Sequence, residues 1–252
     1  MRSYAIGDIH GHIDLLRAAH ARIAQDRKDR GDTDAPIVHL GDLVDRGPAS
    51  NEVVEYLRRG PTPGTRWITL RGNHDSLFAR FMADPASRDP GLRSDLTYID
   101  RRIGGATTLA SYGVRDPGTR PVAEVHADAA YLVPVTHAPW MATLPLTFAH
   151  DSNLFVHAGI RPGVPLAQQT ETDLMWVRAP FHDFTGSFGP LIVHGHTPVE
   201  TPMHYGNRLN LDTGAAYGGP LTAVVIEGRE VFELTDQGRV PVLPTPRYSA
   251  GC

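Results

Sequence analysis

The chain has very little cysteine: among its 252 residues there is one, Cys252. An intramolecular disulfide and a thiolate metal site are therefore excluded. Long apolar runs are also missing, so no segment approaches the length needed to span a membrane. Residues 1–11 contain no apolar stretch of signal-peptide length. We therefore expect a cytoplasmic protein without a membrane partner.

Surplus positive charge is absent as well. The chain has 24 Lys and Arg against 28 Asp and Glu, for a formal net charge of −4. Nucleic acids favour a basic surface, so we do not expect one as the main partner. The chain shows no internal repeat and no low-complexity linker, and 252 residues with 41% hydrophobic content are enough to bury a large core. We expect a single domain spanning residues 1–252.

What the chain does contain is a series of short apolar runs that end abruptly in glycine and polar residues. Their β-branched content and glycine borders predict buried strands, and helical spacing between the early runs predicts helices. Strands alternating with helices indicate an α/β layered domain, in which ligands gather beyond the carboxyl ends of the strands. The runs are residues 4–6, 37–40, 67–70, 154–156 and 191–193.

The remaining segments support weaker predictions. A helix is expected around 53–57, with Ser50 as its cap and Gly60 as its stop. Residues 83–150 are rich in proline and glycine, and we interpret them as an insertion that flanks or covers the site. Within them a helix is predicted over 98–103. A strand pair at 221–227 and 230–234 follows, and beyond Pro241 we expect a loosely attached end.

The first polar cluster contains Asp8 and His10, which can point to one side of an extended segment. A carboxylate and an imidazole suit Zn, Mn or Fe, although this pair alone occurs often by chance. The second cluster, residues 41–48, is Gly-Asp-Leu-Val-Asp-Arg-Gly-Pro, and a solvated turn does not explain the whole octamer. In it, Asp42 closes a strand and can bridge two metals.

The third cluster, residues 71–75, is Arg-Gly-Asn-His-Asp. Asn73 can offer its amide oxygen to a hard cation. His74 cannot easily ligate the same ion as its neighbour in an extended segment, so proton transfer suits it better, with Asp45 fixing its tautomer. Arg71 provides a planar fork for phosphate oxygens.

Two further strand ends carry His157 and His196, which would add a nitrogen-rich second metal site. A lone histidine at a strand end is usually structural. Five such clusters in one chain, all at strand ends, are improbable as independent accidents.

The motif order Gly-Asp-Ile-His-Gly, Gly-Asp-Leu-Val-Asp-Arg-Gly, Arg-Gly-Asn-His-Asp, Val-His-Ala-Gly and His-Gly-His-Thr resembles the calcineurin-like metallophosphoesterase superfamily. The Asp-Arg-Gly ending of the second motif is similar to the phosphoprotein phosphatase branch, and to its bacterial and bacteriophage lambda-type serine/threonine phosphatases. The resemblance covers about residues 4–228.

This resemblance implies two facing mixed β-sheets flanked by helices, a four-layer sandwich. It also implies two divalent metal ions, with manganese favoured and iron or zinc as alternatives. Position by position, it implies that Asp8, His10 and Asp42 hold the first metal, with Asp42 bridging, that Asn73, His157 and His196 hold the second, that Asp45 and His74 form the acid pair, and that Arg46, Arg71 and Arg178 grip the phosphate.

One position departs from many superfamily members, whose Gly-His-x-His motif ends in a further metal ligand. Here that position is Pro198, so we expect a more open shell around the first metal. The phosphoprotein phosphatase branch also lacks this histidine. His194 is an alternative ligand to His196, but His196 fills the motif position and is preferred.

The function expected is a phosphomonoesterase acting on phosphoserine or phosphothreonine in proteins, by in-line attack of a metal-bridging hydroxide with His74 as general acid. The alternative is hydrolysis of dinucleotide polyphosphates such as diadenosine tetraphosphate. A phosphodiesterase or nuclease is disfavoured by Pro198 and the lack of a basic surface. A non-catalytic binding protein is not expected, because no ligand is missing. Nothing in the sequence specifies an oligomeric state.

Overall fold

The computed structural model describes residues 1–61 and 64–245, and their strands form two sheets. The first sheet has six strands in the order β11-β10-β9-β1-β2-β3, and the second has five in the order β4-β5-β6-β8-β7. Strands β1, β2 and β3 run parallel, as do β5, β6 and β8, while the outer strands pair antiparallel. The strands are β1 (Arg2–Ile6), β2 (Ile37–His39), β3 (Trp67–Thr69), β4 (Thr147–His150), β5 (Asn153–Val156), β6 (Leu191–His194), β7 (Met203–His204), β8 (Arg208–Asn210), β9 (Ala223–Glu227), β10 (Glu230–Thr235) and β11 (Gly238–Pro241).

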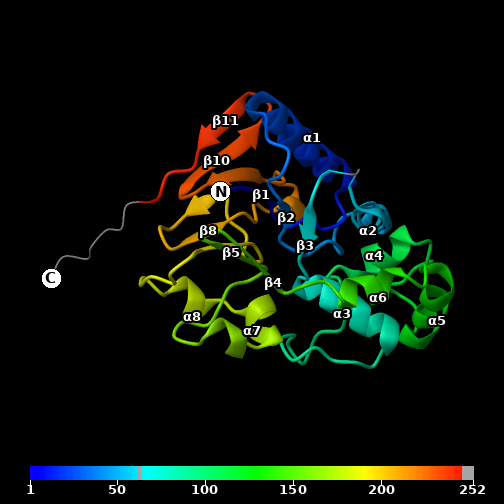
Figure 1. Cartoon of the computed structure of the whole chain (residues 1–252). Coiled ribbons are helices and arrows are strands. Elements are labelled where there is room, and N and C mark those ends of the chain that lie inside the picture. Colours follow the sequence, from blue (N-terminus) through cyan, green and yellow to red (C-terminus); the bar gives the residue numbers. More distant parts are fainter. Residues whose placement is uncertain (62–63, 246–252) are drawn as a thin grey trace.

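Alternation along the strands divides the core into layers. In β1, Ala5 packs between the two sheets against Phe155 and Val193 of the second sheet. Its neighbours Tyr4 and Ile6 point to the other face, where α1 and α2 cover the first sheet. The outer face of the second sheet packs under α7 and α8. The order is helix, sheet, sheet, helix, which confirms the predicted four-layer fold (Figure 1).

The helices are α1 (Ile13–Arg30), α2 (Ser50–Arg59), α3 (Asn73–Ala83), α4 (Gly105–Ser111), α5 (Val122–Leu132), α6 (His137–Ala142), α7 (Glu171–Trp176) and α8 (Ala179–His182), with short 3₁₀ turns at Leu166–Gln168 and Ala215–Tyr217. The helix predicted between the first two apolar runs is present as α1, which buries Ile13, Leu16, Ala19 and Ile23. Gly60 ends α2 with a positive φ, as predicted. No helix among these described segments is long and apolar enough to cross a membrane.

The predicted role of Ser50 is wrong. Ala49 is the N-cap of α2 and Ser50 is its first residue. The Ser50 hydroxyl instead accepts from the Asp45 backbone N–H at 3.2 Å, and its oxygen lies 3.0 Å from the Thr108 hydroxyl. A serine hydroxyl can bond locally or across the fold, and here tertiary partners win over capping.

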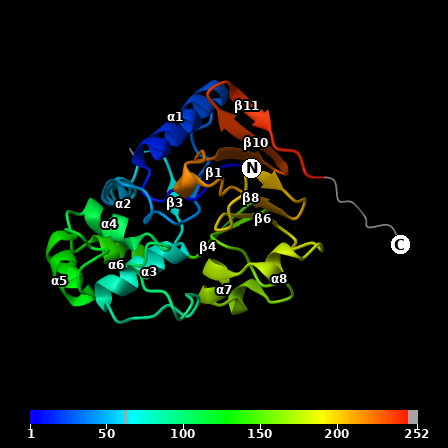
Figure 2. The same ribbon diagram turned by 180° about the vertical axis from the view of Figure 1, so that it is seen from behind.

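The segment 83–150 holds α4, α5, α6 and β4, and its helices gather beside α3 at one side of the sandwich, away from α7 and α8 (Figures 1 and 2). The helix predicted over 98–103 is wrong, because these residues form turns. Asp100 accepts from the backbone and the guanidinium of Arg102, which offers the chain an alternative to helical bonding. Gly104, with φ 93°, then starts α4.

The predicted strand pair near the end is present as β9 and β10, with β11 added at the sheet edge. The expectation of a loose end beyond Pro241 is wrong for residues 242–245. Val242 donates its N–H to the Val231 carbonyl, and Thr245 donates to His204 at 2.7 Å. These bonds tie the segment to both sheets. Residues 246–252, including Cys252, lie outside the described residues.

Candidate metal centre

The polar clusters converge because parallel neighbours end at the same edge of each sheet. Asp8 follows β1, Asp42 follows β2, and Asn73 follows β3 as the first residue of α3. From the second sheet, His157 follows β5 and His196 follows β6. Both sheets thus deliver their strand ends to one buried polar site.

Asp42 is the centre of this site, with an exposed fraction of 2%. Its Oδ2 lies 3.4 Å from His10 Nε2, and its Oδ1 lies 3.4 Å from His157 Nε2. Potential ligand atoms come within 4.8 Å of one another in two groups, one of His10, Asp42 and His74, the other of Asp42, His157 and His196. Membership in both groups suits a carboxylate that bridges two cations.

The backbone fixes which ring nitrogen two of these histidines present. His10 Nδ1 donates to the Val44 carbonyl at 2.8 Å, and His157 Nδ1 donates to the Leu40 carbonyl at 2.9 Å. A carbonyl only accepts, so each Nδ1 carries the proton and each Nε2 points its lone pair into the site. Burial lowers the pKa of His10, His157 and His196, which keeps them in the neutral form that binds metal.

Several atoms in the site that could bind a metal ion lack a suitable hydrogen-bond partner. Asp8 Oδ1 and His196 Nε2 are buried with no hydrogen-bond partner among the described residues. Asn73 Oδ1 and His157 Nε2, both acceptors, face each other at 2.9 Å. Buried acceptors of this kind are costly unless satisfied. Divalent cations would satisfy them, so the residues present fit a metal centre.

Carboxylates add to the case. Burial, together with the charges of Asp212 and Asp42, raises the pKa of Asp8 well above its ordinary value. Burial also raises the pKa of Asp212 to about 6. Three acids packed this way repel one another, and a cation among them would offset that repulsion. Asp8 itself lies outside both histidine–aspartate groups, where its Oδ2 accepts from the His196 N–H at 2.9 Å.

Asp212, which follows β8, was not singled out in the sequence. Its sequence signal is weak, because the residues before it, Arg-Leu-Asn-Leu, alternate in polarity and no glycine directly precedes the acid. Asp75 was quoted in a motif without a role. Its two oxygens accept from Leu43 N and Gly72 N, both at 2.8 Å, so it holds the loops after β2 and β3 together.

The loops carry unusual backbone conformations. Positive φ, which L residues seldom adopt, costs of order 1–3 kcal/mol at each position and persists only where the surroundings impose it. The site residues with positive φ are His10, Asp42, Asp45, Arg46 and His196.

Asn73 and His74 are the first two residues of α3. The prediction that they lie in an extended segment is therefore wrong.

His74 and Asp45 are in direct contact, with His74 Nδ1 2.7 Å from Asp45 Oδ2. The other oxygen, Asp45 Oδ1, accepts from the hydroxyls of Tyr98 and Thr108, each at 2.8 Å. Asp45 is therefore fully bonded and wholly buried. Neither Tyr98 nor Thr108 was expected, because no local pattern links them to the motif.

The three arginines predicted to bind phosphate have different surroundings. Arg46 donates Nη1 to His10 Nε2 at 3.0 Å and Nη2 to His74 Nε2 at 3.1 Å, and its guanidinium lies over the exposed ring of Tyr217. Arg71 pairs with Glu171 at 3.1 Å and donates to the Ala142 carbonyl at 2.6 Å. Arg178 is exposed at the start of α8, and its charge acts on His157 and His196.

His194 is separate from this cluster. Its Nδ1 donates to the Gly195 carbonyl at 3.1 Å, and its ring packs edge-on against Phe181 at 4.9 Å between centroids. It belongs to neither group of potential ligands among the described residues. The geometry favours His196, which reaches Asn73 Oδ1 through Nδ1 at 2.9 Å.

Comparison with known proteins places this arrangement among phosphoesterases. A family model described as calcineurin-like phosphoesterase matches residues 1–225. The chain is 29% identical over 231 residues to serine/threonine-protein phosphatase 1 of Salmonella typhimurium, covering 89% of this chain and 91% of that protein. It is also 29% identical over 246 residues to bis(5'-nucleosyl)-tetraphosphatase PrpE of Halalkalibacterium halodurans, covering 87% of each. A cold-active protein-tyrosine phosphatase of a Shewanella species shares the fold, with a TM-score of 0.61, 17% identity and coverage of 96% of this chain and 80% of that one.

Proposed function

The chain belongs to the calcineurin-like phosphoesterase family and is a metal-dependent phosphoester hydrolase, and on this basis we propose that it removes phosphate from phosphoserine or phosphothreonine in proteins. The observation that carries the phosphomonoesterase chemistry is the Asp45–His74 contact beside Asp42, which is shared by both groups of potential ligands. The protein substrate is supported by the similarity to the Salmonella protein phosphatase.

In this proposal Asp8, His10 and Asp42 would hold one divalent cation, and Asn73, His157 and His196 would hold the other, with Asp42 shared by both. Manganese is the metal we propose, since mixed oxygen and nitrogen ligands suit it, and the cytoplasm is the proposed location. When bound, the two cations supply Lewis-acid activation of water and neutralise charge on the phosphate.

The protein groups then do three things. Asp45 holds the Nδ1 proton of His74, so that Nε2 faces the site and carries the proton given to the departing alkoxide. In the structure, the Arg46 guanidinium donates hydrogen bonds to Nε2 of His10 and to Nε2 of His74. Turning it to the phosphate frees His10 for the cation and His74 Nε2 for protonation. Arg71 and Arg178 add charge-assisted bonds to the phosphate oxygens as negative charge spreads in the transition state.

A second candidate is hydrolysis of dinucleotide polyphosphates. It is supported by the similarity to the tetraphosphatase of Halalkalibacterium halodurans, which extends over almost the same share of the chain at the same identity. The site residues described above serve both reactions, because each requires hydroxide attack on a phosphorus held by cations and arginines.

The test is phosphate release by metal-stripped protein reloaded with manganese, offered a phosphothreonine peptide and diadenosine tetraphosphate in parallel. An EDTA-treated sample is the control. Faster peptide cleavage is expected. Faster dinucleotide cleavage would replace the protein phosphatase proposal with the second candidate. Absence of metal-dependent release from both substrates and from p-nitrophenyl phosphate would overturn both.

A further inference from the structure

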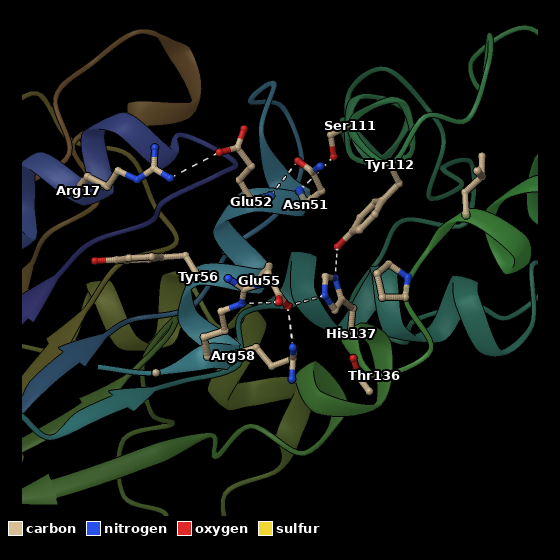
Figure 3. A pocket seen from close by; sticks show the side chains of 14 residues that line it. Arg17, Asn51, Glu52, Glu55, Tyr56, Arg58, Ser111, Tyr112, Thr136 and His137 are labelled. Carbon is tan, nitrogen blue, oxygen red and sulfur yellow. Dashed lines mark hydrogen bonds and ion pairs between the residues drawn. The ribbon is translucent and has the colours of Figure 1, made fainter. Parts of the chain in front are cut away.

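A cavity of about 750 Å³ lies between α2, α4 and α6 (Figure 3). It is lined by residues of these helices and of the turn before α6, together with Arg17 of α1 and Leu132 of α5, and we call it the α2–α6 cavity. None of the residues assigned above to metals, proton transfer or phosphate lines it. Small-molecule sites commonly have volumes of about 300–1,000 Å³. The cavity therefore has the size of a ligand site that is separate from the metal centre.

The charges around the α2–α6 cavity favour an anion. Its lining includes three arginines, Arg17, Arg58 and Arg59, against two acids, Glu52 and Glu55. His137 adds no charge near neutral pH, because burial lowers its pKa. The lining residues thus carry one formal positive charge in excess, with Arg58 and Arg59 both paired to Glu55, although the whole chain has a formal net charge of −4. A positive hollow in an acidic protein concentrates anions locally.

The floor of the cavity is preorganised. Tyr112 bonds His137 Nδ1 at 2.8 Å, His137 Nε2 lies 3.1 Å from Glu55, and Glu55 accepts from Arg58 at 2.9 Å. These side chains form a continuous row across the view in Figure 3. The row joins α4, α6 and α2, so the shape of the floor does not depend on a ligand.

Arg17, by contrast, is held loosely at the cavity mouth. Its guanidinium lies 3.6 Å from Asp14 and 3.6 Å from Glu52, beyond normal hydrogen-bond length, and its side chain is 54% exposed. Exposed pairs of this kind are worth about 0–1 kcal/mol. Arg17 can therefore turn to a phosphate at little cost.

The remaining walls of the cavity are suited to the aromatic or apolar part of an organic ligand. Two aromatic rings, Tyr56 and Tyr112, face the cavity together with Leu132 and Pro134. An inorganic anion would leave this surface uncovered. A ligand with an anionic group and a flat or apolar body covers both parts, which describes a nucleotide-sized phosphate monoester.

Hydrogen bonds also connect residues of the cavity wall to Asp45. On one wall, Asn51 N donates to Ser111 Oγ, and on the inner side the preceding residue Ser50 bonds Asp45. In α4, Ser111 lines the cavity one turn after Thr108, which binds both the backbone and the carboxylate of Asp45. A shift of α2 against α4 therefore changes the bonds that orient the partner of His74.

We propose that the α2–α6 cavity is a regulatory site for a small organic phosphate monoester, and that its occupancy alters turnover through α2, α4 and Asp45. The regulatory part rests on the phosphatase function proposed above, while the binding part does not. Arg17 provides the movable contact to the phosphate, and the tyrosines and apolar residues contact the body of the ligand.

The experiment uses the full chain loaded with manganese and AMP as the probe, with binding measured by isothermal titration calorimetry. The variants are Arg17→Ala, Thr136→Trp to fill the cavity, and Arg46→Ala to weaken binding at the metal centre. The matched control is Arg30→Ala, which removes an exposed arginine from the same helix as Arg17. We expect AMP binding to persist in Arg46→Ala and Arg30→Ala, and to weaken roughly tenfold or more in the other two variants.

In parallel, kcat for p-nitrophenyl phosphate is measured with and without AMP. AMP acting only as a product at the metal centre would raise KM and leave kcat unchanged. We expect kcat to change about fivefold, the lower end of coupling between two sites, and this change to disappear in Thr136→Trp. No AMP binding, or binding lost only in Arg46→Ala, would overturn the site. Binding at the cavity with unchanged kcat would overturn the coupling. Lack of hydrolysis without AMP would instead overturn the phosphatase proposal.

Discussion

Tyr98 donates its hydroxyl hydrogen to Asp45 Oδ1 at 2.8 Å across 53 residues of sequence, and both side chains are buried. Burial and the neighbouring charge of Asp45 raise the pKa of Tyr98, so the phenol stays protonated as a donor. The segment 83–150 thus reaches the metal centre from behind, through a buried hydrogen bond to the partner of His74. Through this bond the segment supports the site.

Replacing Tyr98 by Phe should therefore reduce turnover without removing a group that touches substrate. A hydrogen bond to a charged group contributes about 1.5–3 kcal/mol, so a fall in kcat of roughly 10-fold is expected, with KM little changed. The basic limb of the pH–rate profile should shift as well, because a general acid must be protonated and Asp45 holds the proton on His74. Tyr131→Phe, at an exposed tyrosine, is the control. An unchanged pH profile with a lowered Tm would indicate a structural role only.

His74→Ala should lower kcat roughly 10²- to 10⁴-fold on a phosphothreonine peptide, since the departing alkoxide then leaves without a proton. With p-nitrophenyl phosphate, whose leaving group needs no proton, the loss should be smaller. Steady-state kinetics on both substrates provides the comparison. Equal losses on the two would argue against His74 as the acid.

Asp42→Asn should reduce the metal content of the purified protein below two ions per chain, because Asp42 is common to both ligand groups. Elemental analysis after dialysis measures this. Manganese at about 100 times its dissociation constant should stabilise the wild type by roughly 3 kcal/mol and raise Tm by about 5–10 °C. The rise should largely vanish in Asp42→Asn but persist in Asp14→Asn, whose side chain is 93% exposed. A full rise in both would contradict the proposed centre.

Gly195→Ala should disturb the same centre by a different route. A Cβ at this position would lie 1.9 Å from Asp8 Oδ1, so the carboxylate must move. We expect metal affinity to fall about 10-fold or more, as measured by competition with a fluorescent chelator. At Gly118 the nearest atom to an added Cβ is 3.8 Å away, so Gly118→Ala serves as the matched substitution. Unchanged affinity in Gly195→Ala would place Asp8 outside the coordination shell.

We expect the stability of the protein to depend on pH through His20, a residue that lies outside the metal centre. Burial lowers its pKa to about 4, and its ring bonds Tyr56 and His39 at 2.9 Å each. Between pH 6.5 and 4 the unfolded chain therefore takes up a proton that the folded chain refuses, and stability is lost as the pH falls. His20→Gln cannot titrate, so the slope of unfolding free energy should flatten by about 1.4 kcal/mol per pH unit in that window. Urea unfolding of metal-free protein at several pH values measures it, and parallel curves would contradict the assignment.

Local signals in the sequence predicted an α/β layered domain and the convergence of the clusters, whereas the four-layer sandwich was implied by the family resemblance. An apolar run followed by glycine and an acid, as at Asp8 and Asp42, marks the carboxyl end of a buried strand wherever it occurs. Parallel pairing then brings such ends together without further information. Asp212 follows Arg-Leu-Asn-Leu with no glycine directly before it, so this signal does not mark it.

What the sequence did not predict depends on contacts between distant segments. Thr108 lies 63 residues from Asp45, and nothing around it distinguishes it from any helical threonine. Serine is a residue type that often caps helices, yet the hydroxyl of Ser50 bonds to Asp45 and Thr108 instead. The turns over 98–103 form where Asp100 and Arg102 compete locally with helical bonding.

The interior between the two sheets is apolar over most of its extent. It becomes polar where Asn73, which follows β3 of the first sheet, meets His157 and His196, which follow β5 and β6 of the second. A cation at that junction would join the edges of the two sheets at one end. At the other end the contacts include an exposed pair of the Met1 amino group with Asp151 at 2.7 Å and a bond from His150 to the Arg2 carbonyl at 3.2 Å, and exposed pairs of this kind contribute little. Thermal opening of the sandwich should then begin at the far end. The reacting groups would be the last part of the molecule to lose their geometry, and chelation would reverse that order.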